Sequence, residues 1–93
     1  MISKDVFALP AILDITKAQE LHGHMVDRLN VGPVVVDASA VDRVSTPCIQ
    51  VLLAAARSAD GAGTSFRIAD ASEALRAALV DLGLQAEFKN WMV

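Results

Sequence analysis

The side chains of this sequence that could do chemistry gather in one short segment, residues 37–50. This segment holds two carboxylates and three hydroxyl groups, on Asp37, Asp42, Ser39, Ser45 and Thr46. A serine beside a carboxylate could act as the nucleophile of a hydrolase, but that chemistry needs a histidine base, and the segment contains none. We therefore predict that the protein is not an enzyme.

The hydroxyl of Thr46 lies where a helix is predicted to begin. Pro47 follows it, and proline is favoured at the start of a helix because its missing N–H would be unpaired there anyway. A phosphoryl group on Thr46 would be stabilised by the helix N-terminus and would add about two negative charges near Asp37 and Asp42. In the simpler alternative Thr46 only caps the helix.

The other reactive side chains do not indicate a second site. Cys48 precedes an apolar helix face, so we interpret it as a buried structural cysteine. His22 and His24 are two residues apart, which places them on different sides of a helix, and we expect both at the surface. Gly61 and Gly63 follow a helix rather than open one, which indicates a helix end and not a phosphate loop. The sequence therefore predicts no metal and no cofactor.

A strand and a helix frame the 37–50 segment. The consecutive β-branched residues 34–36 predict a central parallel strand that is buried on both faces and closed by Asp37. The helix that begins at Thr46 is predicted to end at residues 60–63. Its core-facing side chains are expected to be Ile49, Leu52, Leu53 and Ala56.

The N-terminal third of the chain predicts strands followed by a helix. Residues 5–9 and 11–15 are expected to form two short strands, or one interrupted strand, around Pro10. A helix is predicted from Thr16, as its N-cap, to about Asn30, before a Gly-Pro pair that breaks it.

The C-terminal third predicts a strand, a helix and a short tail. Residues 65–69 alternate in polarity and read as a strand. Ser72 is expected to cap a third helix, and Gly83 to end it in a Schellman motif completed by Leu84. The tail, residues 85–93, is expected to form an edge strand around Phe88 or to cap the sheet with Trp91. The apolar stripe of the third helix is predicted to be Leu75, Leu79 and Leu82.

This alternation of strands and helices predicts an α/β fold. We expect one small domain, residues 1–93, with a mixed sheet of about four or five strands and three helices packed on it. Hydrophobic residues make up 54% of the chain and aromatic residues only 4%, so the core is expected to be aliphatic.

The charge pattern excludes several classes of partner. The net charge is −3, and the 8 basic residues are spread singly, so neither nucleic acid nor an anionic membrane surface is an expected partner. The single cysteine fits a reducing compartment, and no apolar run is long enough to span a membrane. We expect a soluble, cytoplasmic protein.

The segment from Val35 to Ala56 resembles the STAS domains, a family that contains sulfate-transporter tails and anti-sigma-factor antagonists. The family pattern is a strand ending Asp-Leu-Ser, a hydrophobic residue, and then Asp-Ser-Ser/Thr-Gly-Leu-Gly-Val-Leu opening a helix. Residues 66–75 and 81–84 resemble the family's ending. The resemblance covers essentially the whole chain and implies the STAS fold.

In antagonist members of this family, a partner kinase phosphorylates the serine that follows the loop aspartate. The resemblance places this acceptor on Thr46, as a threonine. The surrounding residues depart from the pattern: the loop aspartate falls on Ser45, the next hydroxyl on Pro47 and the glycine on Cys48. These departures change the surface that a kinase would recognise.

The resemblance implies a regulatory module that docks a signalling kinase, such as a chemotaxis histidine kinase. Asp37 and Ser39 match the family's upstream Asp-x-Ser, and Thr46 is the candidate phosphoacceptor. In the alternative, the protein is a constitutive STAS subunit of an ABC-type lipid transporter. The residues do not indicate an oligomeric state. The residues expected to contact a partner are Asp37, Ser39, Asp42, Ser45, Thr46, Pro47 and Gln50.

Overall fold

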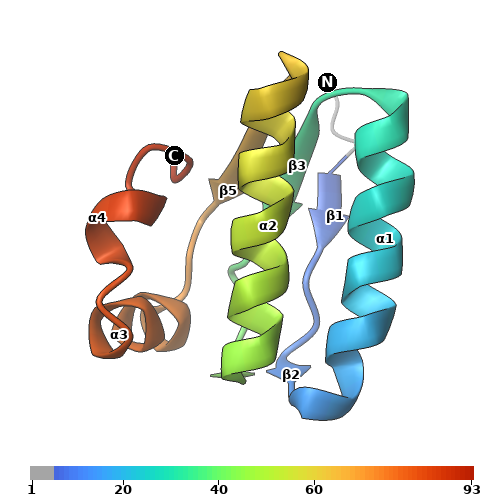
Figure 1. Cartoon of the computed structure of the whole chain (residues 1–93). Helices are drawn as coiled ribbons and strands as arrows, with labels where there is room; N and C mark the ends of the chain where they lie inside the picture. Colours follow the sequence, from blue (N-terminus) through green and yellow to red (C-terminus); the bar gives the residue numbers. More distant parts are fainter. Residues whose placement is uncertain (1–5) are drawn as a thin grey trace.

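The computed structural model describes residues 6–93 (Figure 1). Asp5, the first residue of the predicted first strand, therefore lies outside the described residues. The elements in chain order are β1 (Val6–Ala8), β2 (Ile12–Leu13), a 3-10 turn η2 (Ile15–Lys17), α1 (Ala18–Val31), β3 (Val34–Asp37), β4 (Arg43–Val44), α2 (Thr46–Ala62), β5 (Phe66–Ala69), α3 (Glu73–Asp81) and α4 (Gln85–Phe88).

The predicted α/β architecture is confirmed, but the five strands within residues 6–93 form two sheets instead of one. β3 lies between β1 and β5 in a parallel sheet, and β2 pairs with β4 in a second parallel sheet. All pairings between the described strands are parallel, so the predicted mixed sheet is not found there. The N–H of Leu9 still donates to Asp37 O at 2.9 Å. Beyond Pro10 the chain no longer pairs with β3, and Ile12 and Leu13 pair with β4 instead.

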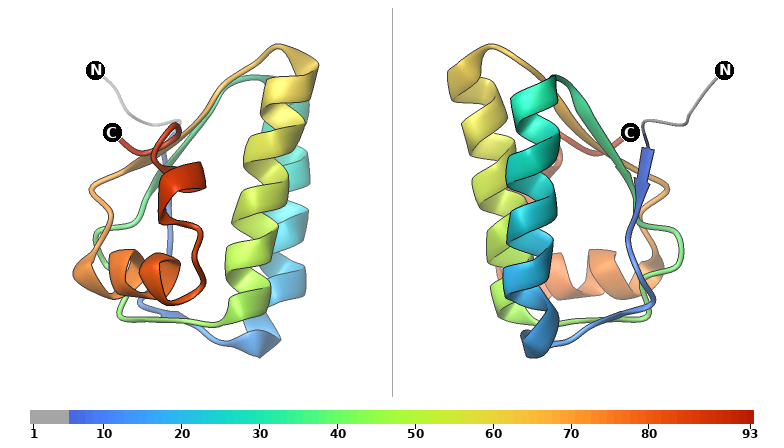
Figure 2. Two further views of the ribbon diagram at one scale, coloured as in Figure 1. Left: turned by 60° about the vertical axis from the view of Figure 1, so that its left-hand side comes forward. Right: turned by 90° about the vertical axis from the view of Figure 1, so that its right-hand side faces the viewer.

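Helices α1 and α2 run side by side along one face of the β1-β3-β5 sheet (Figures 1 and 2). Val34 and Val36 are buried, and Val35 between them is only half-buried. The prediction that this strand is buried on both faces is therefore wrong at Val35. Strand side chains alternate between the two faces, and α1 and α2 both lie on the same one. Phe66 and Ile68 of β5 are also fully buried.

The start of α1 differs from the prediction. Asp14 caps the 3-10 turn that precedes the helix, and its carboxylate accepts hydrogen bonds from both the backbone N–H and the hydroxyl of Thr16. Lys17, the N-cap residue of α1 itself, makes no side-chain capping bond. Thr16 therefore lies inside the 3-10 turn η2, and α1 begins after that turn at Ala18. An ionised carboxylate accepts more strongly than a hydroxyl, which explains why the aspartate takes the capping position. The end of α1, at Val31, agrees with the prediction.

Most of the predicted helix ends are confirmed. α2 begins at Thr46 and ends before Gly63, which has a left-handed backbone with φ of 75°. The hydroxyl of Ser72 accepts from the N–H of Leu75 at 3.1 Å, as expected of an N-cap. The core-facing residues of α2 are also as predicted, with Leu53 only partly buried.

The end of α3 forms the predicted Schellman motif. Leu84 N donates to Leu79 O at 2.9 Å, Gly83 N donates to Val80 O at 3.0 Å, and Gly83 has φ of 71°. Leu75 and Leu79 are buried as predicted, but Leu82 is 40% exposed. Leu82 is the C-cap residue, so it lies beyond the last turn that contacts the core.

The tail contains a helix where an edge strand was one of the two expectations. Phe88 ends the short helix α4 and is fully buried, with its ring edge-on to Trp91. Met92 forms an isolated parallel bridge with Ile68, which places the end of the chain beside β5. Trp91 is 5% exposed, and this burial agrees better with the second expectation, in which Trp91 caps the sheet, than with an edge strand around Phe88. α4 is a fourth helix, where three were predicted.

Candidate functional site

Asp37 ends β3 with its carboxylate turned back onto the following backbone. Its Oδ1 accepts the N–H of Ser39 at 2.9 Å, which closes a tight turn directly after the strand. This N–H, and after it the hydroxyl of Ser39, holds the pKa of Asp37 below its ordinary value of 3.8. Asp37 is therefore a carboxylate at neutral pH, and it adds negative charge at the end of the sheet.

The loop after Asp37 is anchored through the backbone of Ala38. Its N–H donates to Ala69 O at 3.0 Å, and its carbonyl accepts from Ser72 N at 3.2 Å and from Val41 N at 3.3 Å. Ala38 and Val41 are buried, whereas Ser39 at the tip is exposed. The loop is thus fixed to the end of β5 and the start of α3, and only its tip faces solvent.

Strand β2 holds the connection between this loop and α2. The N–H groups of Asp42 and Arg43 both donate to Ala11 O, at 2.7 and 3.0 Å, and Ser45 N donates to Leu13 O at 2.8 Å. These three bonds fix the backbone directly before the first turn of α2. The position of this helix start therefore depends on a strand from far earlier in the chain.

Ser45, not Thr46, occupies the N-cap position of α2. Its backbone is extended, and its hydroxyl makes no capping bond. Ser45 Oγ is buried and has no hydrogen-bond partner within residues 6–93. The interpretation of Thr46 as the cap is therefore wrong: Thr46 is the first residue of the helix, and its side chain is exposed.

The first turn of α2 offers few backbone donors to an anion. Pro47 lies in this turn and has no N–H, so Thr46 and Cys48 are its residues with a backbone donor. Cys48 is fully buried, as predicted, with Sγ 3.4 Å from Asp14 O. The turn therefore combines a solvent-exposed hydroxyl with an inward-facing thiol.

The predicted contact residues fall into two groups, one at the end of β3 and one at the start of α2. Asp37 and Ser39 touch through the turn at the end of β3, and Ser45, Thr46 and Pro47 form the start of α2. Asp42 is exposed on the connection between them, and Gln50 is exposed one turn into the helix. Within residues 6–93 no side-chain hydrogen bond joins the first group to the second, and the backbone bonds of Ala38, Asp42, Arg43 and Ser45 fix the connection between them.

Sequence reasoning missed two residues beside this helix start. Asp14 reaches α2 through the Cys48 contact, and hydrogen bonds from Thr16, its side chain first, lower the pKa of the Asp14 carboxyl below 3.8. The next residue, Ile15, opens the turn η2, which contacts α2, and it is 67% exposed although it is large and apolar. An aspartate two residues before a threonine is a local capping signal for Asp14, but no local signal places Ile15 near α2.

The histidines do not form a metal site. His22 and His24 are both exposed, as predicted, and the ring of His24 lies 4.9 Å from that of Phe7. No group of three or more potential ligands that could hold a metal ion occurs within residues 6–93.

The family model described as "Mlab, STAS domain" matches residues 3–93 of the chain. The chain therefore belongs to the STAS domain family, as the sequence resemblance predicted. No curated protein matches the sequence.

Solved structures share the fold at low sequence identity. The anti-sigma factor antagonist SpoIIAA, in its unphosphorylated form, matches with a TM-score of 0.76 and 13% identity, over 100% of this chain and 82% of SpoIIAA. A candidate anti-sigma factor antagonist from Thermotoga maritima matches with a TM-score of 0.74 and 22% identity, over 92% of this chain and 78% of that protein. A sulfate transporter family protein from Wolinella succinogenes matches with a TM-score of 0.69 and 16% identity, over 99% of this chain and 79% of that protein.

No helix in the described part of the chain is both long and apolar enough to cross a membrane.

Proposed function

We propose that this STAS domain is a non-enzymatic regulatory module that docks a signalling kinase in the cytoplasm. The docking surface comprises the loop after β3 and the first turns of α2. Thr46 is its candidate phosphoacceptor, and a histidine kinase of a chemotaxis system is the partner that we favour. In this proposal residues 1–93 act as one domain, without nucleic acid, membrane insertion or cofactor.

The observation that carries this proposal is the presentation of Thr46. Its hydroxyl is exposed at the N-terminus of a 17-residue helix. The three backbone bonds to Ala11 and Leu13 and the anchored Ala38 loop hold that helix start in place. A partner can therefore bind a surface that is already ordered, which lowers the entropic cost of association.

The comparison with SpoIIAA supports a role for the hydroxyl. SpoIIAA is an anti-sigma factor antagonist, and its structure is described as the unphosphorylated form, so phosphorylation distinguishes two forms of that protein. We carry this distinction to Thr46. Because Pro47 removes one backbone donor from the first turn, a phosphate here would be held less firmly than at an ordinary helix start. Docking is therefore the first part of our proposal, and phosphorylation is the second.

A pull-down with a histidine kinase from the same genome tests the docking. We expect the wild-type chain to retain the kinase, and Thr46→Glu and Asp37→Ala to weaken retention by changing the charge of the surface. Ser58→Glu, at an exposed position of α2 outside the docking surface, is the matched control and should bind like the wild type. Absence of wild-type binding, or equal binding by Thr46→Glu, argues against the proposal.

The intact mass of the protein from its own cells tests the phosphorylation separately. A phosphoryl adduct that is lost in Thr46→Val supports the switch. An unmodified mass under all growth conditions removes Thr46 as an acceptor while leaving the docking surface in place.

A second candidate is a constitutive STAS subunit of an ABC-type lipid transporter. Two observations favour it: the fold also matches a sulfate transporter family protein, and the family model carries the description Mlab. Such a subunit needs a permanent interface and no switch. Co-purification with a membrane-bound ATPase, at equal yield for wild type and Thr46→Glu, would favour this candidate over the kinase.

A further inference from the structure

A cavity of about 540 Å³ lies between α3, α4 and the C-terminal segment, residues 89–93. Its volume falls within the range of about 300–1,000 Å³ that is typical of small-molecule sites. It shares no residue with the docking surface proposed above. Its walls are formed by Arg76, Leu79, Gln85, Ala86, Lys89, Met92 and Val93.

The walls of this cavity combine apolar surface with two cations. Arg76 comes from α3 and Lys89 directly follows α4, and none of the lining side chains is acidic. Arg76 Nε donates to Ala71 O at 3.2 Å, which orients the guanidinium. Neither Arg76 nor Lys89 forms an ion pair within residues 6–93. Both charges are therefore available to a ligand.

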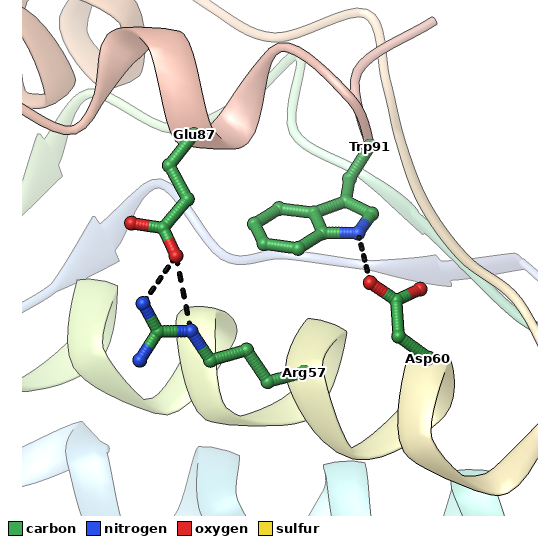
Figure 3. A network of polar contacts seen from close by, with 4 residues as sticks. All are labelled: Arg57, Asp60, Glu87 and Trp91. Atoms are coloured by element: carbon green, nitrogen blue, oxygen red, sulfur yellow. Dashed lines mark hydrogen bonds and ion pairs between the residues drawn. The ribbon is translucent and has the colours of Figure 1, made fainter.

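The carboxylate of α4 is paired with α2 and does not line the cavity. Glu87 is the only acidic residue of α4, and it pairs with Arg57 of α2 (Figure 3). Figure 3 shows its side chain reaching toward α2. Glu87 thus leaves the positive charge of Lys89 uncompensated, which favours an anion on the cavity side of α4.

The wall formed by the C-terminal segment is fixed before any ligand binds. Trp91 Nε1 donates to Asp60 Oδ2 at 3.3 Å, which attaches the segment to α2 (Figure 3). Ile68 N donates to Trp91 O at 2.8 Å, and Val93 N donates to Ile68 O at 3.0 Å. These bonds hold Met92 and Val93 against β5, so a ligand meets a cavity that is already formed.

We propose that this cavity binds a small amphiphilic anion, with an apolar chain and one carboxylate or phosphate head group. The apolar chain lies on Leu79 and Met92, and the head group lies between Arg76 and Lys89. Methionine is flexible and fits apolar chains of varied shape. An acidic peptide fits less well, because Gln85 is the only uncharged polar side chain among the lining residues and offers few bonds to a peptide backbone.

Titration of the full chain with decanoate tests this proposal. Trp91 is the only tryptophan of the sequence and adjoins Met92, so its fluorescence should change on binding. We expect saturable binding below the micelle-forming concentration, with backbone NMR shifts at residues 76–93. Decyl phosphate distinguishes the two head groups: tighter binding than decanoate favours a phosphate ligand, and weaker binding favours a carboxylate. Decanol should bind more weakly than either.

Charge variants separate the proposal from non-specific binding. Lys89 is exposed and makes no side-chain bond within residues 6–93, so Lys89→Gln should fold normally. This substitution should lower the affinity for decanoate by about fivefold, the upper range for an exposed charge pair. The affinity for decanol should not change. Arg43→Gln, an exposed cation on β4, is the matched control and should leave the affinity unchanged. The proposal would be overturned if decanol and decanoate bound with equal affinity, or if both variants lost the same affinity for decanoate. It would also be overturned if the NMR shifts fell outside the cavity, or if an acidic peptide bound and the two amphiphilic anions did not.

Discussion

At the scale of single residues, Asp37 joins the end of the sheet to the proposed docking surface. The Ser39 N–H, and after it the Ser39 hydroxyl, lowers the pKa of this carboxyl below 3.8 in the folded protein. The ionised form therefore stabilises the folded state above about pH 3.8, and this contribution is lost as the pH falls through the lower folded pKa.

NMR titration of the Asp37 carboxyl carbon checks this assignment. We expect a midpoint below 3.8 in the wild type and a higher midpoint in Ser39→Ala, which loses the hydroxyl but keeps the N–H. A wild-type midpoint at or above 3.8 would contradict the turn that the structure describes.

The two serine caps offer a matched comparison of hydrogen bonding. Ser72 Oγ accepts a bond from Leu75 N, whereas Ser45 Oγ is buried without a partner in the described chain. Ser72→Ala should therefore lower the free energy of unfolding by about 1 kcal/mol. Ser45→Ala should leave it unchanged or raise it, because the substitution removes a buried polar atom that is not satisfied. Urea denaturation measures both, and an equal loss in the two variants would be inconsistent with these contacts.

At the scale of elements, two glycines predict opposite effects of the same substitution. Gly23 lies inside α1, and a Cβ added there meets nothing within 4 Å, so Gly23→Ala should stabilise the protein by up to about 1 kcal/mol. Gly83 has φ of 71° at the end of α3, so Gly83→Ala should destabilise it by about 1–2 kcal/mol. Thermal or urea unfolding of the two variants tests the pair. Destabilisation by Gly23→Ala would mean that α1 does not run through this position.

At the scale of the whole molecule, residues 85–93 are attached to α2 through the buried side chain of Trp91 and through the exposed ion pair between Glu87 and Arg57. Trp91 is 5% exposed, and Trp91→Ala should cost about 3–5 kcal/mol through the cavity that it leaves. The Arg57 side chain is 62% exposed, and Arg57→Ala should cost less than about 1 kcal/mol. Chemical denaturation of both variants ranks the contacts, and the reverse order would indicate that the ion pair, not the indole, holds the segment.

The two proposed sites lie in different parts of the fold. The docking surface depends on β2, β4 and the start of α2, whereas the cavity depends on α3, α4 and the segment beside β5. Variants at Thr46 and Lys89 can therefore be tested independently. A Thr46 variant that no longer docks a partner would therefore say nothing about whether the cavity binds decanoate.

The sequence by itself determined the features that arise between close neighbours. The cap at Ser72, the Schellman ending at Gly83 and the β-branched strand before Asp37 all depend on residues a few positions apart. Their backbone preferences act in the same way whatever the rest of the chain does. For the same reason the family pattern around Thr46 could be recognised from the sequence without any structure.

Only the tertiary structure decided how distant segments meet. The contacts Asp14–Cys48, Arg57–Glu87 and Asp60–Trp91 join residues 34, 30 and 31 positions apart. Strand β4 has only two residues, too few to show a hydrophobic period, and it exists because β2 offers it a partner. Which long-range pairs form depends on how all the apolar faces pack together, because no local preference selects one distant partner over another. The ordered start of α2 and the cavity beside α4 both follow from that packing.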